Sequence, residues 1–379
     1  MTIGAPAIPG MALSDVDTPA LIIDLDAFER NLGVMADSAR RLGMRLRPHA
    51  KTHKSPIIAL KQMRLGAVGV CCQKVSEAEA LVRGGVGDVL VTNEIIGAQK
   101  LDRLTRLARE AKIAVLSDHA ASLDGLETAA ARAGVRLDVL VEIDVGGRRC
   151  GIYPGAPAAQ LACGIASRKH LRFAGLHAYH GTAQHFRTDS ERREAIGRAG
   201  ALVRESLDAL AREELACDVV TGAGSGTFEI EAASGIWSEI QPGSYVFMDA
   251  DYARNQSAGG GPFDAFEHAL FVLATVMSTP APERAVLDAG HKALSNDSGP
   301  PDVRGLDGAI YHRPSDEHGV LDVSKCARRP VLGDKVMLIP GHCDPTVNLH
   351  DWFVCIRGLN GPEPRVEAVW PVAGRGAVV

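Results

Sequence analysis

The stretch AVGVCCQKVSEAEALVRGGVGDVLVTN (67–93) contains one strand–helix–strand unit. Its two ends, AVGVCC (67–72) and DVLVTN (88–93), are short apolar runs rich in valine, which is typical of buried strands. The segment between them, SEAEALVRGG (76–85), is amphipathic and rich in Ala, Leu and Glu, which predicts a helix. A strand, a helix and another strand in this order indicate an α/β fold with a parallel sheet.

The same alternation continues through the first two thirds of the chain. Further amphipathic helices are predicted at GAQKLDRLTRLAREA (97–111) and DSERREAIGRAGALVRESLDALAREEL (189–215). Eight strands, each followed by a helix, fit a (β/α)8 TIM-type barrel better than a doubly wound sheet, which normally stops at about six strands. The predicted strands are 44–51, 67–72, 88–93, 112–118, 137–144, 173–180, 218–222 and 239–246.

The pattern changes after about residue 262, where strand-like runs alternate with Gly, Pro and Asp turns. This texture predicts a second, all-β domain, and the glycine-dense SAGGGPFD (257–264) suits a boundary. The isolated strand ALIIDLD (20–26) precedes the barrel series and is a candidate to pair with the β domain. We therefore predict a barrel over 27–261 and a β domain built from 1–26 and 262–379.

Composition excludes several classes of function for these 379 residues. Lys and Arg number 41 against 46 Asp and Glu, a net charge of −5, which disfavours binding to nucleic acid or anionic membranes. No apolar run reaches the ~18 residues of a membrane helix, since ALFVLATVM (269–277) is about as long as a strand. The first residues lack signal-peptide features, and the eight cysteines form no CxxC framework. These features predict a cytoplasmic protein with free thiols.

Reactive residues of such a barrel are expected at the C-terminal ends of its strands. The first strand runs into RPHAKTHK (47–54), and a period of two places Arg45, Arg47, His49 and Lys51 on one face. Lys51 would then project at the barrel mouth among other cations, where its pKa would be lowered and its amine could form a Schiff base. A basic strand end at the surface is the alternative, and Lys54 is the competing lysine.

Two glycine-rich loops follow the last two strands of the barrel. In TGAGSGT (221–227), alternating glycines remove side chains where backbone N–H groups could close on an anion. QPGSY (241–245) adds a second Gly-Ser turn, which a closed barrel places beside the first. A lysine able to form a Schiff base, opposite two anion-binding loops, is the arrangement that pyridoxal phosphate needs.

The β domain contains the segment PGHCDPT (340–346). On extended backbone His342 and Asp344 share a face and could bind one metal, whereas Cys343 points away. One imidazole and one carboxylate leave positions for water and substrate and suit Mn²⁺, Mg²⁺ or Co²⁺; participation of Cys343 would favour Zn²⁺. In SDEHG (315–319), His318 is either part of a solvated turn or a further acid–base candidate.

Together these motifs resemble the D-threonine aldolase family, which belongs with the alanine racemase-like, fold-type III pyridoxal phosphate enzymes. Within that family, GVCCQKVSEAEA (69–80), FMDADY (247–252) and GHCDPT (341–346) resemble most the 3-hydroxy-D-aspartate aldolases. The resemblance extends along nearly the whole chain, through 17–31, 47–55, 69–85, 88–94, 141–151, 175–185, 221–227, 239–252, 315–319 and 340–352.

By position, the resemblance implies that Lys51 carries the cofactor beside His49, that Arg149 lies near its phenolic oxygen, and that Tyr179 forms a wall of the pocket. Arg148 competes with Arg149 for that role. His342 and Asp344 match the metal pair, because aldolases of the family have H-x-D whereas its D-serine dehydratases have H-x-C. The residues implied to hold the phosphate are Thr221, Gly222, Gly224, Ser225, Gly226, Gly243, Ser244 and Tyr245.

The function implied is a retro-aldol cleavage of a D-3-hydroxy amino acid, with pyridoxal 5′-phosphate and a divalent metal as cofactors. The products would be glycine and glyoxylate from 3-hydroxy-D-aspartate, or glycine and acetaldehyde from D-threonine. A D-serine or D-3-hydroxyaspartate dehydratase is the alternative, and the β domain argues against a non-catalytic cofactor carrier. The resemblance further implies a homodimer. Candidates to select the substrate's side chain are His177, His180, His185, Arg313 and His318.

Overall fold

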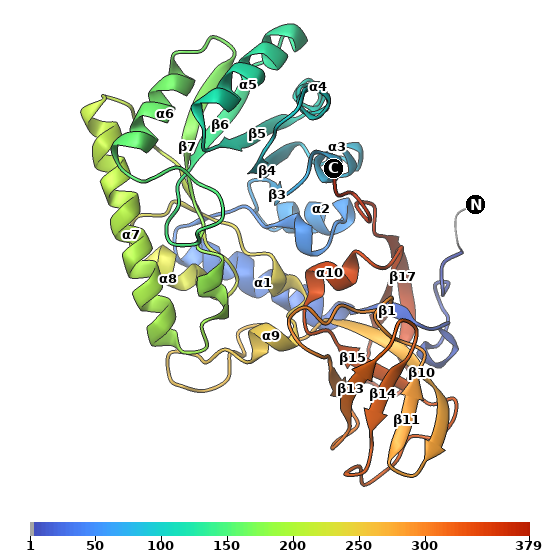
Figure 1. Ribbon diagram of the computed structural model, residues 1–379. Helices are drawn as coiled ribbons and strands as arrows, with labels where there is room; N and C mark the ends of the chain where they lie inside the picture. The colour runs from blue at the N-terminus through green and yellow to red at the C-terminus, as the bar shows by residue number, and fades with distance from the viewer. Residues whose placement is uncertain (1–3) are drawn as a thin grey trace.

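The computed structural model describes residues 4–379, which form two sheets of different kinds (Figure 1). The first is an eight-stranded parallel sheet in the order β2-β9-β8-β7-β6-β5-β4-β3. Hydrogen bonds from Cys71 N to Pro48 O (2.8 Å) and from Val68 N to Leu46 O (2.9 Å) join the two ends of this sheet. The predicted barrel is therefore confirmed. Its strands are β2 (Arg45–Leu46), β3 (Val70–Cys72), β4 (Asp88–Glu94), β5 (Lys112–Ser117), β6 (Leu137–Glu142), β7 (Leu171–Ala178), β8 (Val220–Gly222) and β9 (Glu239–Ile240).

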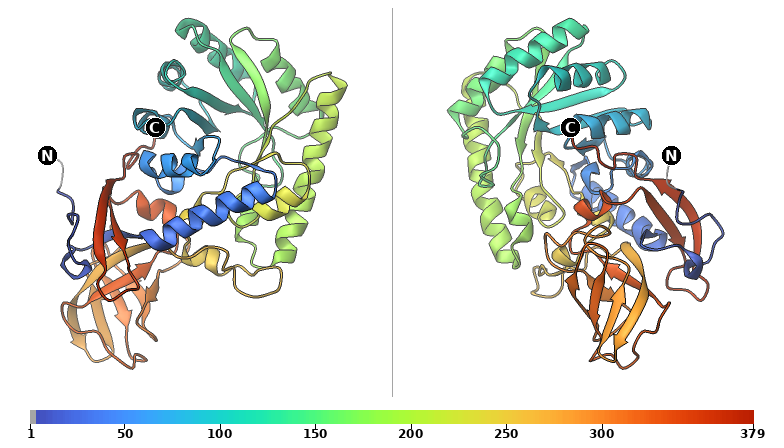
Figure 2. Two further views of the ribbon diagram at one scale, coloured as in Figure 1. Left: turned by 180° about the vertical axis from the view of Figure 1, so that it is seen from behind. Right: turned by 45° about the vertical axis from the view of Figure 1, so that its right-hand side comes forward.

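Helices lie along the outside of this sheet (Figure 2). In α4, Leu101, Leu104 and Leu107 are buried against the barrel whereas Arg106 is exposed, as the amphipathic pattern predicts. None of the helices in residues 4–379 combines the length and apolar character needed to cross a membrane. The barrel helices are α2 (Pro56–Arg64), α3 (Val75–Arg83), α4 (Ala98–Leu107), α5 (Ala120–Ala133), α6 (Ala156–Ala166), α7 (Asp189–Arg212), α8 (Phe228–Ala233) and α9 (Ala250–Ala253).

The second sheet is mostly antiparallel and has the order β13-β14-β11-β10-β1-β16-β17, with β15 beside β10 and β12 beside β15. β1 (Ala20–Asp24) pairs with β10 and β16, so the N-terminal strand joins the second sheet as predicted. The domain limits at 26/27 and 261/262 stay a prediction. The other strands are β10 (Leu270–Ala281), β11 (Arg284–Leu287), β12 (Asp302–Arg304), β13 (Ile310–Pro314), β14 (Gly319–Asp322), β15 (Lys335–Ile339), β16 (Trp352–Arg357) and β17 (Arg365–Pro371).

The barrel and the second sheet share a hydrophobic core. Helix α1 (Leu25–Arg41) runs from β1 along the barrel, as the left view of Figure 2 shows. Phe247 packs between Phe28 of α1 and Phe353 of β16, with ring centroids 6.2 and 5.8 Å apart. This shared core holds the short helix α10 (Cys343–Val347), which follows β15, at the mouth of the barrel.

Two predicted strands are much shorter in the structure than in the prediction. β2 ends at Leu46 instead of Lys51, and β9 ends at Ile240 instead of Val246. Pro48 and Pro242 follow these strands, and proline cannot donate a hydrogen bond to a ladder. After β2 and β9 the chain continues in the 3₁₀ turns η2 (Ala50–Thr52) and η4 (Ser244–Val246). Two further 3₁₀ turns are η1 (Leu13–Asp15) and η3 (Thr182–His185).

Arg45 and Arg47 do not accompany Lys51 to the barrel mouth. The guanidinium of Arg47 is buried near the N-terminal ends of the strands, 3.0 Å from Glu239 and 2.6 Å from Asp88. Arg45 also pairs with Glu239, at 3.1 Å. The predicted cluster of cations around Lys51 is therefore wrong, because acidic residues at the opposite end of the barrel bind both arginines.

Replacing Arg47 with Met is expected to lower the free energy of unfolding by about 3–5 kcal/mol, because it leaves the buried carboxylate of Glu239 without its inner partner. Urea denaturation of the two proteins measures this difference. Arg30→Met is the control: Arg30 pairs with Glu267 and both side chains are half exposed, so its loss should cost about 1 kcal/mol or less. Equal losses for the two variants would contradict the role given to Arg47.

Candidate active site

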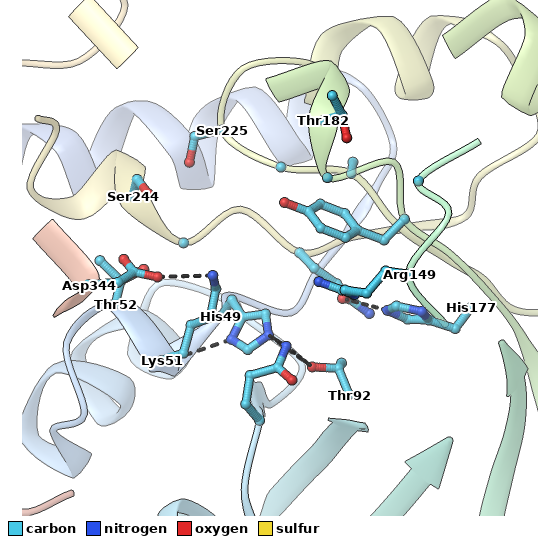
Figure 3. A pocket seen from close by; sticks show the side chains of 18 of the residues that line it. His49, Lys51, Thr52, Thr92, Arg149, His177, Thr182, Ser225, Ser244 and Asp344 are labelled. Atoms are coloured by element: carbon cyan, nitrogen blue, oxygen red, sulfur yellow. Dashed lines mark hydrogen bonds and ion pairs between the residues drawn. The ribbon is translucent and has the colours of Figure 1, made fainter. Parts of the chain in front are cut away.

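A cavity of about 410 Å³ lies at the C-terminal ends of the barrel strands, where they meet the helix α10, which follows β15 of the second sheet (Figure 3). Residues from both halves of the molecule line it, so the site depends on how the two sheets pack together. The predicted site residues that line this cavity are His49, Lys51, Arg149, Tyr179, Gly224, Ser225, Gly243, Ser244, His342 and Asp344.

Lys51 lies on η2 and points its amine toward α10. Its Nζ is 3.0 Å from Asp344 Oδ2, and this carboxylate raises the pKa of Lys51. The lowered pKa predicted from neighbouring cations is therefore wrong for the structure as described, because the charge beside the amine is negative. Lys54 points elsewhere, since its Nζ pairs with Glu77 at 2.7 Å in a buried contact.

His49 supports the turn that carries Lys51. Its Nδ1 accepts a hydrogen bond from Lys51 N (3.3 Å), so the proton of the neutral ring is on Nε2, which contacts Thr92 Oγ1 at 2.9 Å. Gln73 Nε2 also donates to Thr92 Oγ1. Burial lowers the pKa of His49 well below its ordinary value, and the nearby Lys51 acts in the same direction. The ring is therefore a neutral, fixed part of the floor of the cavity.

Arg149 and Tyr179 form the opposite wall. The Arg149 guanidinium lies over the Tyr179 ring, 5.9 Å from its centroid, and 3.8 Å from Glu142 Oε1. Arg148 takes a left-handed conformation (φ 50°) and does not line the cavity. The structure therefore favours Arg149 over Arg148 as the arginine that faces a bound molecule. Burial raises the pKa of Tyr179, so its phenol is neutral.

Two glycine-rich loops, 221–227 and 241–245, close the end of the cavity. A Cβ on Gly224 would lie 2.5 Å from Gln184 Oε1, and one on Gly243 would lie 2.7 Å from Thr52 Oγ1. Both positions therefore need glycine. Ala223 has a φ of 68°, a left-handed conformation that also occurs in anion-binding backbone turns. The loops fit a phosphate group of a cofactor.

The other residues predicted for the phosphate belong to the same two loops but do not line the cavity. Thr221 Oγ1 donates to Glu239 Oε1 (2.9 Å), and the Tyr245 hydroxyl accepts a hydrogen bond from Gln62 Nε2 in the core (3.0 Å). A Cβ on Gly222 would meet Ala178 O at 2.2 Å, so this glycine serves strand packing. The N–H of Gly226 already donates to the side chain of Gln184 (3.0 Å).

The segment with His342 and Asp344 is the start of a helix, which corrects the predicted extended strand. His342 precedes α10 in an extended conformation, and Asp344 lies in its first turn. Asp249 holds this helix in place because its Oδ2 accepts a hydrogen bond from Cys343 N (3.1 Å). The thiol of Cys343 is buried and donates to Met248 O, as expected of a residue that points away from a metal.

His342 and Asp344 present complementary donors to the cavity. His342 Nδ1 contacts Asp297 Oδ2 at 2.7 Å, which leaves Nε2 for a ligand. Burial opposes both pKa shifts, yet Asp344 raises the pKa of His342, and Lys51 with His342 lowers the pKa of Asp344 to about 2. The Oδ1 atom of Asp344 is buried and has no hydrogen-bond partner among residues 4–379. An imidazole and an unsatisfied carboxylate fit a divalent cation.

Comparison with known proteins agrees with this geometry. Residues 23–251 match the family described as alanine racemase, N-terminal domain, and 269–356 match a putative serine dehydratase domain. A D-threonine aldolase from Arthrobacter sp is 47% identical to this chain, over 98% of this chain and 96% of its own length. A 3-hydroxy-D-aspartate aldolase from Paracoccus denitrificans (strain Pd 1222) is 48% identical, over 98% and 95%. This chain belongs to the same aldolase family.

The fold of this family member is also close to that of a solved relative. The crystal structure of D-threonine aldolase from Filomicrobium marinum covers 100% of both chains, with a TM-score of 0.96 and 50% identity. The alanine racemase-like architecture expected from the sequence is thereby confirmed.

Sequence reasoning gave no role to an acidic pair that shapes the site of this aldolase family member. His185 lines the cavity, and its Nδ1 contacts Asp251 Oδ2 at 2.6 Å. Arg187 also pairs with Asp251. Asp249 and Asp251 lie in FMDADY, two and four residues after Phe247, which the sequence analysis used only for the resemblance. Their position, a few residues after the predicted phosphate loop 241–245, is the feature of the sequence that could have indicated a role in the site.

Two other predicted candidates, His180 and His318, do not line the cavity. His318 is exposed in the turn between β13 and β14, where its Nδ1 contacts Ser315 Oγ at 3.4 Å. The side chain of Arg313 lies outside the described part of the chain. His177 does line the cavity (Figure 3). Its Nε2 contacts Gln241 Oε1 at 3.2 Å.

Proposed function

We propose that this chain is an aldolase that uses pyridoxal 5′-phosphate and a divalent metal to cleave D-3-hydroxy amino acids. The observation that carries the proposal is the convergence of Lys51 with His342 and Asp344 in one cavity, across the two sheets. The names of the relatives, D-threonine aldolase and 3-hydroxy-D-aspartate aldolase, support the same class of reaction.

The residues around Lys51 fit the cofactor. Gly224 and Gly243 leave room for its phosphate, Arg149 faces the cavity for its phenolic oxygen, and Tyr179 offers a flat wall. When bound, pyridoxal phosphate stores the electron pair that the broken C–C bond releases. Lys51 would hold the cofactor covalently until substrate replaces it, and the neutral His49 ring would keep the η2 turn fixed.

The other end of the cavity provides acid–base chemistry. His342 and Asp344 would hold Mn²⁺, Mg²⁺ or Co²⁺, a Lewis acid that favours the ionised form of a nearby hydroxyl. His185 faces the same space, and the carboxylate of Asp251 fixes its ring. Although burial opposes it, Arg187 and His185 lower the pKa of Asp251, so this carboxylate stays ionised. We assign to His185 the removal of the proton from the substrate's 3-hydroxyl group.

The structure supports an aldolase over the dehydratase alternative at one position. An H-x-C pair would need a thiol facing the cavity, but the carboxylate of Asp344 faces it and the Cys343 thiol is buried against Met248 O. A carboxylate suits harder cations than zinc. A site with an imidazole and a carboxylate, and no thiolate, therefore supports the aldolase function that the family membership suggests.

Product analysis tests the proposal. With D-threonine and with both diastereomers of D-3-hydroxyaspartate, the enzyme should release glycine and an aldehyde in equal amounts, without ammonia. EDTA should lower the rate by about 100-fold or more, and added Mn²⁺ should restore it, because the Lewis acid supplies several kcal/mol of charge stabilisation. Ammonia with an oxo acid would instead identify a dehydratase. Full activity in EDTA would remove the metal from the mechanism.

A further inference from the structure

A chain of buried polar side chains lies directly behind the loop TGAGSGT. Gln184 Oε1 accepts a hydrogen bond from Gly226 N (3.0 Å), and Gln184 Nε2 donates to Thr227 Oγ1 (2.7 Å). Thr227 Oγ1 in turn donates to Glu231 Oε1 (2.8 Å). The exposed fractions of Gln184, Thr227 and Glu231 are 1%, 2% and 1%. None of the three lines the cavity.

The amide of Gln184 also sets the shape of this loop. A Cβ on Gly224 would lie 2.5 Å from Gln184 Oε1, and one on Gly226 would lie 3.3 Å from the same atom. The backbone on both sides of Ser225 therefore packs against the side-chain amide of Gln184. Ser225 lies between these glycines and lines the cavity, and its Oγ accepts a hydrogen bond from Tyr245 N (3.0 Å).

Gln184 is itself held rigidly on the turn η3. Asn255 Nδ2 donates to Gln184 O (2.9 Å), and Arg187 donates to Asn255 Oδ1 (2.9 Å). The next residue, His185, is fixed by Asp251. The side chain of Gln184 thus connects the loop to a turn that is anchored from its other side.

We propose that Gln184 is a positioning residue that fixes the TGAGSGT loop from behind, in the conformation that receives the phosphate group of the cofactor. Gln184 does not line the cavity, so it would act without touching the cofactor. This inference rests on the proposed function, since it needs pyridoxal phosphate as the ligand. Binding to a preorganised loop avoids the cost of ordering that loop, and a buried N–H that loses its acceptor is costly.

The test compares pyridoxal phosphate with pyridoxal, which lacks the phosphate, in apoenzyme carrying Gln184→Met. Methionine has a similar length, but its sulfur is only a weak acceptor for Gly226 N and it cannot donate to Thr227. We expect the Kd of pyridoxal phosphate, measured by absorbance titration, to rise about tenfold, because about 1.4 kcal/mol of preorganisation is lost. The Kd of pyridoxal should change less than twofold.

A second variant and a matched control keep the test valid even if Gln184→Met folds poorly. Thr227→Val cuts the next link of the chain and should weaken pyridoxal phosphate, and not pyridoxal, by about threefold. Thr105→Val removes a comparably buried hydroxyl from α4, far along the chain from the loop, and should change neither Kd.

The outcomes separate this inference from the proposed function. Equal weakening of both ligands in the Gln184 and Thr227 variants would show that these residues serve general stability, and would overturn the inference. Unchanged affinity for pyridoxal phosphate in both variants would overturn it as well. If the wild-type chain binds neither ligand, the proposed cofactor is wrong and the inference falls with it.

Discussion

Replacing Lys51 with Ala is expected to abolish covalent attachment of pyridoxal phosphate and to lower kcat by about 10³-fold or more. The amine of Lys51 is the one that enters the cavity beside the glycine loops, and its ion pair with Asp344 fixes its position. Reduction of the holoenzyme with borohydride, followed by mass spectrometry of its peptides, should find the cofactor on the peptide that contains Lys51 and should find none on the variant.

Lys54→Ala is the matched control, because it removes a lysine only three residues away. Lys54 directs its amine to Glu77, and both side chains are buried. The variant should keep the adduct on Lys51. It should also unfold more easily, since Glu77 loses its partner in a buried site. An adduct on Lys54, or one that survives in Lys51→Ala, would show that the lysine assignment is wrong.

The number and order of the barrel strands could be predicted because they depend on local pattern. Short valine-rich runs such as 88–93 alternate with amphipathic segments. The continuous apolar runs indicate strands buried on both faces, and the amphipathic segments indicate helices buried on one face. Strand ends were predicted less well. The 44–51 and 239–246 segments look continuous in composition, but each contains a proline that cannot donate to the ladder, and the strand in each is only two residues long.

In the site, too, the features that depend on neighbouring residues in the sequence could be predicted, and those that depend on distant residues could not. The glycines of the two loops and the H-x-D pair stand out in the sequence because each motif is contiguous. The environment of Lys51 does not, because Asp344 approaches from nearly 300 residues further along the chain and reverses the expected pKa shift. The role of Gln184 could not be predicted for a related reason. Its side chain contacts the backbone of a loop about 40 residues away, and no local sequence pattern indicates that contact.

Replacing His342 with Gln is expected to weaken the binding of Mn²⁺ to the holoenzyme by more than about 100-fold, since loss of even an outer partner of a metal ligand costs about 10–100-fold. The site offers one imidazole and one carboxylate from this chain, so neither can be spared. Calorimetric titration with Mn²⁺ measures the affinity. At a Mn²⁺ concentration that just saturates the wild-type enzyme, glycine release from D-threonine should fall in parallel, and EDTA should have little further effect on the variant.

Cys343→Ser provides the control, because Cys343 lies between the two proposed ligands but points away from them. Its Sγ donates to Met248 O in the core, and a serine hydroxyl can make the same contact. Mn²⁺ affinity should stay within twofold of the wild-type value, at a cost of about 1 kcal/mol in stability for the buried hydroxyl. If Cys343→Ser loses the metal while His342→Gln keeps it, the thiol is the ligand, and the preference should move from Mn²⁺ to Zn²⁺. The position of the thiol behind α10 argues against that result, because the helix would have to unwind its first turn before sulfur could enter the cavity.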